Sequence, residues 1–446
     1  MHTSARRCFW IGLLVILSLM LPAVLAHGAG SDLQQEGSLI RDYEAARVEI
    51  SGFAVKSPAE YRKILDYYEG LANEKSIVHR FITPEGDSCV CIDIDSQSSI
   101  GADKKSGKVA LEPEVLPAEN PLRPRYPNAA AKPLPGARWL DGAPDKAGNL
   151  RQCPPNSFPK LLPRLDILLR YETLEDYFRK YPSKKGTNDL QKAMAHEYAY
   201  GYKNENIIGQ GADFSVWQPA VETSSEFSLS QLWCSGGSGN KKQTVELGWQ
   251  EYPSHYGDSQ PRLFIYFTTN GYSSAGNNTG CYNLDCTGFV QVNGDVVIGG
   301  ALAPISTAGG EQYYVTLETY RDPANGNWWI RWDGDTWLGY YPTELFSSTG
   351  LKYNSGIIEF GGEIIDDGIN GHTMTDMGSG RFPSEGWGNA AWTRDIHYWD
   401  TGGSYQQAFG LTTARTNSDY YDIELIETST DAEWGVYYFF GGPGGR

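Results

Sequence analysis

The sequence lacks the motifs that mark the common kinds of catalytic site. The chain of 446 residues contains only seven histidines, and none lies at a metal-ligand spacing from another. It has no GxSxG nucleophile elbow, no HExxH metal-binding helix and no glycine-rich phosphate loop. These absences give little support to serine, zinc or nucleotide chemistry, although a triad scattered along the chain would leave no local motif. Carboxylates are the reactive groups that remain.

Positive charge is scarce in the second half of the chain. From residue 190 onward there are 12 Lys and Arg against 30 Asp and Glu, whereas the residues before 190 are close to neutral. Nucleic-acid binding needs clustered Lys and Arg, so the acidic half argues against nucleic acid as a partner. The negative charge suits a protein that works at low pH, where many carboxylates are protonated and repel one another less.

Only one long apolar run occurs, and it lies at the N-terminus. Arg6 and Arg7 precede the apolar residues 9–21, and small residues follow as far as Ala26. A membrane anchor needs about 20 apolar residues to span a bilayer. The order of charged, apolar and small residues therefore predicts a secretory signal peptide over residues 1–26. We expect a secreted, extracellular protein with no membrane contact.

Six cysteines remain after the signal peptide, and an oxidising compartment favours pairing among them. Cys281 and Cys286 predict a local disulfide that closes a tight loop. Such a small ring pins local geometry more than it stabilises the fold. In the N-terminal half, Cys153 is expected to pair with Cys89 or with Cys91, and the sequence leaves that choice open.

Two further residues of the second half have separate interpretations. Cys234 has no evident partner, and a buried free thiol is its simplest interpretation. Asn277 begins an Asn-Asn-Thr sequon in a stretch rich in Gly, Ser and Asn. Because such stretches form surface turns, Asn277 is a predicted glycosylation site.

The first half of the chain mixes short helical patterns with proline-rich connections. Ser57, Pro58 and Glu60 form a capping box with proline at the first helical position, and apolar residues follow at helical spacing. Residues 83–95 predict a turn and a strand, and residues 160–186 predict another apolar helix.

These patterns suggest a part that is removed from the mature protein. The prolines between residues 111 and 140 indicate an extended linker. We predict a small α+β pro-region over residues 27–188, with a processing junction at residues 183–186, which are exposed in character, basic and end in glycine. Two permanently joined domains are the alternative.

The second half of the chain has the residue pattern of β-strands. Runs of alternating polar and apolar residues are separated by Gly, Asn and Asp turns, and long helical patterns are nearly absent. We predict an antiparallel β-sandwich of the jelly-roll or concanavalin-like type over residues 189–446. The runs that carry this prediction are FSLSQLW, TVELGWQEY, RLFIYFTT, YYVTLETY and NWWIRW.

Two strands combine a carboxylate with a glycine on one face. In TVELGWQ, alternation places Glu246 and Gly248 on the face opposite Trp249. A residue without a side chain beside a carboxylate would leave room for a substrate backbone. The alternative is a solvated carboxylate on an outer sheet face, which is where most glutamates lie.

The second strand has the same pattern. In IIEFGGEI, Glu359, Gly361 and Glu363 share one face, provided that the Gly-Gly pair does not form a bulge. If the two strands are neighbours, Glu246 and Glu363 could face one another across a groove. Two close carboxylates do not ionise together easily. The ionised member can take a proton from water, while the protonated one polarises a carbonyl and protonates the leaving amine.

Ordered blocks through most of the chain carry a family resemblance. In sequence order they are PEGDSCVCIDI, QCPPNSFP, SEFSLSQLW, VELGWQEYPSHYGDSQPRLFIYFT, TGCYNLDCTGFVQ, DPANGNWWIRW, GYYP, EFGGEI, GHTMTDMGSGRFPSEGWG and WGVYYFFGGPG. The blocks of the second half are similar to the neprosin family of secreted glutamic peptidases, which are common in plants. The first half resembles that family's activation-peptide domain.

The resemblance implies a function and a site. It implies a β-sandwich peptidase whose catalytic dyad is Glu246 and Glu363, with acidic working pH, loss of the pro-region at low pH and cleavage after proline. No cofactor or metal is implied. The partners would be proline-containing proteins or peptides, and the pro-region as an intramolecular inhibitor. Glu359 is the substitute for Glu363, and its own role stays open.

Proline selectivity needs a flat slot lined by aromatic rings. Trp249 and Tyr341 are candidate lining residues, with Gly248 and Gly361 beside the carboxylates, although aromatic residues of a sandwich more often belong to its core. Asp376 and Arg381 stand where the family pattern leads us to expect Gln and His. The strictness of the proline preference is therefore left open.

Two other functions are compatible with the sequence. Sandwich glycosidases also use two carboxylates, and a non-catalytic wall or defence module could keep the same fold. The leading hypothesis is a secreted zymogen in which the less acidic pro-region covers an acidic groove. Protonating the carboxylates would weaken that attraction, which would give acid activation an electrostatic basis. The natural substrate and the oligomeric state are not determined.

Overall fold

The computed structural model divides into two compact units, Met1–Ser51 and Gly52–Arg446. Its described residues are 31–97, 109–119, 131–134, 140–180, 195–369, 371–427 and 434–445. The predicted signal peptide, the junction at 183–186 and the boundary between residues 188 and 189 lie outside these ranges. Among the described helices, none is long and apolar enough to cross a membrane.

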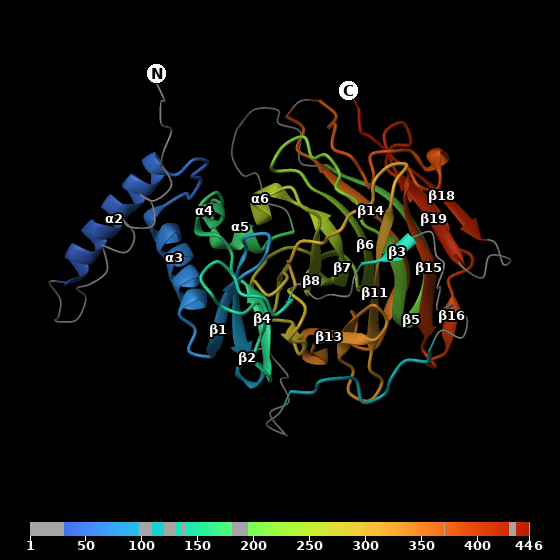
Figure 1. The fold of residues 1–446 in the computed structure, drawn as a ribbon, viewed down its shortest axis with the longest axis horizontal. Coiled ribbons are helices and arrows are strands. Elements are labelled where there is room, and N and C mark those ends of the chain that lie inside the picture. The colour runs from blue at the N-terminus through green and yellow to red at the C-terminus, as the bar shows by residue number, and fades with distance from the viewer. Residues whose placement is uncertain are drawn as a thin grey trace, which may run out of the picture. The chain divides into compact units, whose positions relative to one another are not determined.

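The described part of the first unit, residues 31–51, holds helix α2 (Ser31–Glu49), and the second unit begins with α3 (Pro58–Ala72). The hydroxyl of Ser57 accepts a hydrogen bond from the amide of Glu60 at 3.3 Å, which confirms the predicted helix start. Tyr61 and Ile64 are buried, so one face of α3 packs onto the rest of its unit (Figure 1).

A small antiparallel sheet follows α3 and is closed by a disulfide. Its order is β1-β2-β4, with β1 at Ile77–Ile82, β2 at Ser88–Asp93 and β4 at Ser157–Leu161. Cys91 on β2 is bonded to Cys153, with an S–S distance of 2.03 Å. The partner of Cys153 is therefore Cys91 and not Cys89, which is a buried free cysteine.

The single helix predicted over residues 160–186 is wrong. Its first residues belong to β4, and two short helices follow, α4 (Leu165–Leu168) and α5 (Leu174–Phe178). Pro163 lacks the backbone amide hydrogen that a residue inside a helix donates, so one helix does not run through this position. Thr173 caps α5, since its hydroxyl accepts the amide of Asp176 at 3.1 Å. The apolar residues are buried by short elements instead of by one long face.

The remainder of the chain builds one large curled sheet (Figure 1). Its main path runs β10-β13-β12-β11-β5-β14-β6-β7-β8-β9. The bounds are Val290–Gln291 for β10, Thr336–Tyr341 for β13, Trp328–Trp332 for β12, Gln312–Arg321 for β11, Ala195–Ser215 for β5, Ser355–Asp366 for β14, Ser228–Gly236 for β6, Gln243–Glu251 for β7, Arg262–Thr268 for β8 and Gly280–Tyr282 for β9.

Six further strands join this path from the side. They are β3 (Ala131–Pro133), β15 (Ala391–Asp400), β16 (Tyr405–Gln407), β17 (Thr412–Arg415), β18 (Asp422–Glu427) and β19 (Val436–Gly441). Short helices occupy the loops: η1 (Ile94–Ser96), η2 (Gly239–Lys241), α6 (Pro253–Tyr256), η3 (Thr343–Leu345) and η4 (Pro383–Glu385). Strand β5 joins the parts of the sheet, because its first half pairs with β14 and β17 and its second half with β11 and β15.

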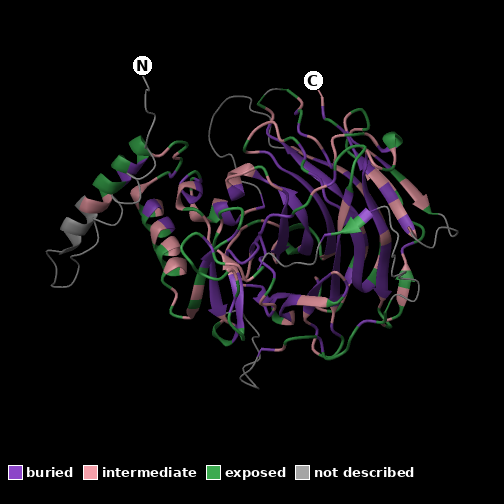
Figure 2. Ribbon diagram, viewed as in Figure 1, coloured by how far each residue is buried: buried purple, intermediate pink, exposed green. Residues whose placement is uncertain are grey.

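The predicted all-β, antiparallel class is confirmed. The five alternating runs quoted above form β6, β7, β8, β11 and β12, and the described pairs between the strands of the main path are antiparallel. Figure 2 shows that these strands are buried along most of their length. The core is rich in tryptophan, with Trp249, Trp328, Trp329, Trp332, Trp392 and Trp399 almost completely buried.

The glycines of the two carboxylate strands serve the sheet itself. A Cβ atom on Gly248 would lie 2.0 Å from the carbonyl oxygen of Ser230, and one on Gly361 would lie 2.3 Å from Cβ of Tyr200. The space that these glycines leave is filled by neighbouring strands. The interpretation that it admits a substrate backbone is therefore corrected.

We expect Gly248→Ala and Gly361→Ala to destabilise the fold, because each new methyl group collides with backbone or Cβ atoms that cannot move alone. Overpacking of this kind costs about 1–3 kcal/mol or more of unfolding free energy. Gly356→Ala on β14 is the matched control, since nothing lies within 4 Å of its added Cβ. Urea unfolding of the three variants measures the difference. Equal stabilities of Gly248→Ala and Gly356→Ala would contradict this packing.

Candidate active site

Three adjacent strands bring the two predicted glutamates together. Glu246 on β7 lies directly opposite Trp233 of β6, and Glu363 on β14 lies directly opposite Leu229 of the same strand. Residues directly opposite one another share a face of the sheet, and so do residues two apart along a strand. Glu246 and Glu363 therefore project from one face on either side of β6, with Gln231 between them.

The Gly361-Gly362 pair does not form a bulge. The register of β14 with β5 runs without a shift from Ile357 to Asp366. Glu359 and Glu363 consequently share the face that carries Glu246. The sequence pattern required a Gly-Gly pair without a bulge, and this is what the structure has. All three carboxylates line the same cavity.

This cavity has a volume of about 240 Å³ and a polar, aromatic wall. Glu246 and Glu363 are 1% and 0% exposed, so both carboxylates are removed from bulk water. The lining residues are Lys180, His196, Tyr198, Tyr200, Gln231, Trp233, Lys242, Glu246, Tyr272, Glu359 and Glu363.

Each of the two buried carboxylates has its own set of hydrogen-bond partners. Oε2 of Glu363 accepts from the side-chain amide of Gln231 at 2.9 Å, and its Oε1 lies 2.5 Å from Nδ1 of His196. Oε1 of Glu246 accepts from the hydroxyls of Tyr272 at 2.6 Å and Thr244 at 2.8 Å. The partners of Glu363 include an imidazole, whereas the partners of Oε1 of Glu246 named above are hydroxyl groups.

One ammonium group of the N-terminal half bridges the two carboxylates. Nζ of Lys180 lies 2.8 Å from Oε2 of Glu246 and 2.8 Å from Oε2 of Glu363. The lysine is itself buried, and its carbonyl oxygen accepts a hydrogen bond from the hydroxyl of Tyr282 at 2.9 Å. Lys180 was not singled out from the sequence, because nothing local distinguishes it from other lysines near residue 183.

The charges in this cavity shift the pKa values of its members. Burial by itself raises the pKa of Glu363, but the Lys180 ammonium and the His196 hydrogen bond outweigh it and lower the value to about 2. Burial lowers the pKa of Lys180, and the charges of Glu246 and Glu363 reverse this and raise it. The Lys180–Glu363 ion pair therefore persists through mildly acidic pH.

Glu359 has the opposite shift from Glu363. Burial raises its pKa to about 7, and the partly compensating groups are Lys242 and the hydroxyl of Ser235, which lies 3.1 Å from Oε2. Glu359 is therefore a neutral carboxylic acid at acidic pH. It is a third acid of the cavity, four residues from Glu363 on the same face of β14.

Comparison with known proteins bears on this arrangement of carboxylates. Residues 224–443, which include both glutamates and the strands that hold them, match the Neprosin family. The chain carries a Neprosin domain. This confirms the resemblance of the second half and supports a glutamic-type peptidase.

One solved structure is similar to the chain at low identity. It is a crystal structure of Scytalido-glutamic peptidase with a peptide based transition state analog. The identity is 7% and the TM-score 0.29, and the match covers 56% of this chain and 100% of that one. So weak a likeness says nothing about the residues of the site.

Two residues expected to bind substrate lie in the core of the Neprosin domain. Trp249 is fully buried, and its indole nitrogen donates to the carbonyl of Ser215 at 2.8 Å. Tyr341 is fully buried between Phe267 and Phe289, with ring centroids 5.1 Å and 4.9 Å away. Neither lines the cavity, because alternation along β7 turns Trp249 away from Glu246, and the ring of Tyr341 fills the core.

The aromatic residues that do line the cavity were missed. They are Tyr198, Tyr200, Trp233 and Tyr272. The period-two spacing of Tyr198 and Tyr200, and the position of Trp233 two residues after Gln231, would have placed them on the dyad face. The sequence alone did not place them there, because it does not show which strands are neighbours in the sheet.

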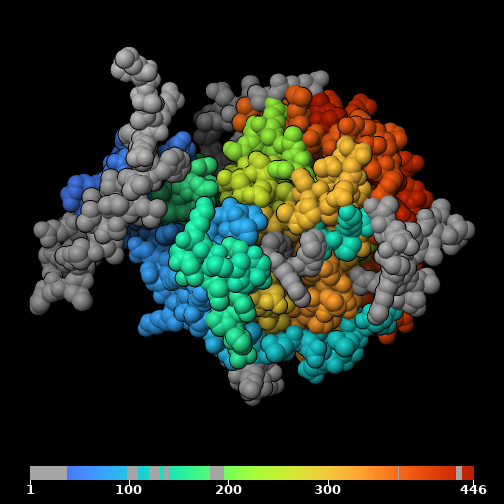
Figure 3. Space-filling view, viewed as in Figure 1, coloured from blue at the N-terminus to red at the C-terminus, as the bar shows by residue number. Residues whose placement is uncertain are grey.

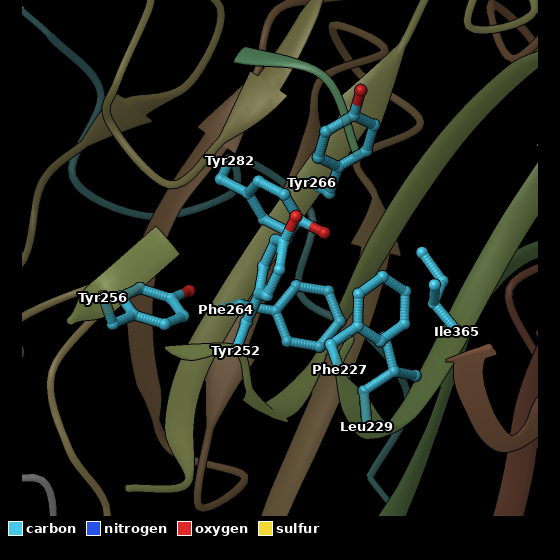
Figure 4. Close-up of a cluster of buried hydrophobic side chains, with 8 residues drawn as sticks. All are labelled: Phe227, Leu229, Tyr252, Tyr256, Phe264, Tyr266, Tyr282 and Ile365. Carbon is cyan, nitrogen blue, oxygen red and sulfur yellow. The ribbon is translucent and has the colours of Figure 1, made fainter. Parts of the chain in front are cut away.

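A cluster of buried aromatic and aliphatic side chains continues the same face of the Neprosin domain (Figure 4). Its members are Phe227, Leu229, Tyr252, Tyr256, Phe264, Tyr266, Tyr282 and Ile365, and Tyr272 packs against it. The cluster positions two groups of the site: the hydroxyl of Tyr272 reaches Glu246, and that of Tyr282 holds the backbone of Lys180.

The loop after Tyr272 carries the predicted disulfide and sequon. Cys281 and Cys286 are bonded, as predicted. Asn277 is exposed, and its side-chain oxygen accepts the amide of Thr287 at 3.0 Å. Glycosylation at this position stays a prediction. Cys234 is a buried free cysteine.

Among the described residues, two groups of side chains beyond the cavity could hold a metal ion. Their ligand atoms lie within 4.8 Å of one another, and the groups are Glu197 with Asp366 and His372, and Glu226 with Asp366 and Asp367. Hydrogen bonds already serve these acids, since Glu226 accepts from Thr373 and Thr375 and Glu197 lies 2.8 Å from Nε2 of His372. The proposed chemistry does not use them.

A second buried acid of the Neprosin domain also prefers its neutral form. Burial, with smaller contributions from Asp258 and Asp376, raises the pKa of Glu251 on β7 to about 8. A carboxyl whose pKa is raised on folding binds its proton more tightly in the folded than in the unfolded chain. Protonation of Glu251 and Glu359 therefore increases the free energy of unfolding as the pH falls from about 8 toward 4.5.

We expect the wild-type chain to be more stable at pH 6 than at pH 8.5, by on the order of 1 kcal/mol for each of these two acids. Glu251→Gln and Glu359→Gln should each reduce this difference, and Glu424→Gln on an exposed position of β18 should leave it unchanged. Urea unfolding at the two pH values gives the comparison. A pH difference that is unaltered in the double variant would contradict the assignment.

Proposed function

We propose that the protein is a secreted zymogen of an acid-active glutamic endopeptidase that cleaves after proline, with Glu246 and Glu363 as its catalytic dyad. The observation that carries the proposal is the meeting of two buried carboxylates at one cavity, where their Oε2 atoms contact the same ammonium group. Two carboxylates so placed suit the activation of water next to a peptide bond.

The two glutamates have different roles in this proposal. Glu363 is the base, because His196 and Gln231 remain beside it when Lys180 leaves and favour its ionised form. Glu246 is the acid, since the partners of its Oε1 are the hydroxyls of Tyr272 and Thr244, which carry no charge at acidic pH. Its Oε2 is the atom that contacts Lys180 in the full chain, and Glu246 lines the cavity.

The reaction follows from these protonation states. Oε2 of Glu363 removes a proton from a water molecule, and the resulting hydroxide adds to the carbonyl carbon of the substrate. Glu246 polarises the carbonyl and then gives its proton to the amide nitrogen, so that the C–N bond breaks and an amine leaves. Glu363 ends protonated and Glu246 ionised, and exchange of one proton with solvent restores the starting state.

The aromatic wall of the cavity supports the proposed preference for proline. Tyr198, Tyr200, Trp233 and Tyr272 offer flat apolar surfaces near the dyad. A proline ring is rigid and apolar, so it packs on such surfaces with little loss of conformational entropy. Glu359 and Lys242 add polar groups for the peptide backbone.

The pro-region inhibits in this proposal by placing Lys180 where water and substrate must bind. Further contacts hold it in place: Tyr177 stacks on His255 at 4.8 Å between ring centroids, and Nη1 of Arg262 lies 2.9 Å from Asp87. Because the pKa of Glu363 is about 2, protonation of this carboxylate does not release Lys180 at mildly acidic pH. Activation instead needs a cut between Lys180 and β5, or the loss of other contacts.

We expect Glu246→Gln and Glu363→Gln each to lower peptide cleavage by about 100-fold or more, because each removes one half of the proton transfer. To make the assay independent of self-processing, each variant is cut by an added sequence-specific protease at a recognition site built between Lys180 and β5. Glu344→Gln, at an exposed position of η3, is the control. Full activity of either variant would contradict the assignment of Glu246 and Glu363 as the dyad. Sugar release without peptide cleavage would favour a glycosidase.

Lys180→Ala should raise the activity of the uncut full chain on a short proline-containing peptide at pH 4–5, by about tenfold or more. The substitution removes the ammonium that occupies both carboxylates, and water can enter in its place. Lys146→Ala, at an exposed lysine of the same half, is the matched control. If the two variants are equally inactive while the processed wild-type enzyme cleaves, Lys180 is not the inhibitory group.

A further inference from the structure

A second part of the N-terminal half lies against strands other than those of the dyad. Residues 109–119 (teal) lie beside the orange residues of the Neprosin domain at the lower edge of Figure 3. The indole nitrogen of Trp399 on β15 donates to the carbonyl of Ala118 at 2.8 Å, and Asp322 accepts the amide of Glu114 at 2.8 Å. Both contacts are made to the peptide backbone of this segment, and the side chain of Glu114 adds a third, since it accepts a hydrogen bond from Asn325 at 3.3 Å.

Residues 131–134 extend the large sheet by one short strand. Strand β3 pairs parallel with β11, with Ala131 opposite Gln312 and Pro133 opposite Tyr314, and the amide of Leu134 donates to the carbonyl of Tyr314 at 2.8 Å. Strand β12 pairs with β11 only from Leu317 onward. The beginning of β11 therefore has a free edge, and β3 occupies it.

The bound segment buries some of its side chains and exposes others. Ala131 is 1% exposed and Leu134 is 4% exposed, whereas Lys132 and Pro133 are exposed. Backbone pairing combined with shallow sites for particular side chains is the pattern by which sheet edges bind extended peptides. The edge accepts a small residue first and an aliphatic residue three positions later.

Lys132, which lies between the two buried residues Ala131 and Leu134, forms an ion pair with the sheet edge. Nζ of Lys132 lies 2.5 Å from Oε1 of Glu311 and 5.9 Å from the centre of the Tyr313 ring. The hydroxyl of Tyr313 donates to the other oxygen of Glu311. The edge thus presents a carboxylate, oriented by a neighbouring phenol, to a basic residue that precedes proline.

We propose that Glu311 and the edge of β11 at Gln312–Tyr314 form an exosite of the mature enzyme for extended segments of protein substrates, of the pattern small–basic–proline–aliphatic. The segment Ala131–Leu134 occupies this edge in the full chain. The inference rests on the proposed function, because the edge becomes free only when the pro-region leaves. An unpaired sheet edge with intact donors and acceptors favours an added strand over any other occupant.

The exosite is separate from the dyad in the order of the sheet. Strand β5 lies between β11 and β14, and β6 lies between β14 and β7. A peptide held at β11 therefore does not displace one held at Glu246 and Glu363. Long substrates gain from two attachment points, since the second contact is made at a high effective concentration.

The test is binding of a fluorescein-labelled peptide, AAAKPLPG, the sequence of residues 129–136, to the processed enzyme at pH 7. Fluorescence polarisation measures affinity, and mass spectrometry verifies that the peptide stays intact. We expect saturable binding that Glu311→Lys weakens about fivefold or more, since an exposed ion pair contributes up to about 1 kcal/mol. The peptide AAAEPLPG should show the reverse preference and bind the Glu311→Lys enzyme better.

Two controls separate this inference from the proposed function. Glu424→Lys makes the same charge change on exposed strand β18, and should bind AAAKPLPG as the wild type does. Cleavage of a short proline peptide by the wild-type enzyme, and its loss in Glu363→Gln, reports on the dyad alone. Absence of AAAKPLPG binding, or binding that Glu311→Lys and Glu424→Lys change equally, overturns the exosite even where cleavage is normal.

Discussion

The contact of the Lys180 ammonium with Glu246 and Glu363 organises the site. Two carboxylates that are almost completely buried and share one face of a sheet repel one another strongly, and a low-dielectric interior makes their isolated ionisation costly. A cation equidistant from both, at 2.8 Å, offsets that cost. In the full chain, the electrostatics of the site therefore include a residue from outside the Neprosin domain. Under the proposed zymogen mechanism, protons, water and His196 would take over the role of the ammonium once Lys180 leaves.

The geometry of the sheet determines which atoms meet in this way. Strand β6 lies between β7 and β14, and the alternation of the three strands directs Gln231 to the space between the glutamates. Gly248 and Gly361 allow the close approach of the neighbouring strands, so the carboxylates are carried on a rigid surface and not on loops. Rigid placement suits the proposed hydrolysis, which needs a water molecule and a peptide bond held in a fixed orientation. The aromatic cluster beside the site keeps Tyr272 in reach of Glu246.

The response to acid is divided among different carboxylates. Glu363 stays ionised down to about pH 2, whereas Glu359 and Glu251 are neutral up to about pH 7 and 8. The pKa of the same residue type is thus shifted in opposite directions: nearby cationic groups outweigh burial for Glu363, and burial prevails for Glu359 and Glu251. Protonation of Glu251 and Glu359 is expected to stabilise the fold at mildly acidic pH, where Glu363 stays ionised and keeps its contact with Lys180. In the proposed zymogen, chain cleavage and acidity would therefore have separate effects on the protein.

Much about this protein can be derived from the order of its residues. Alternation in TVELGWQ and IIEFGGEI predicted which face carries Glu246 and Glu363, the capping box located α3, and the short spacing of Cys281 and Cys286 predicted their bond, because each depends on neighbours close in sequence. The helix expected over residues 160–186 did not form as one, since Pro163 and the Thr173 cap divide it. Only the tertiary structure decided the partner of Cys153, the buried position of Tyr341 and the position of Lys180 between the carboxylates. They depend on contacts between residues far apart in the chain, and no local pattern encodes such distances.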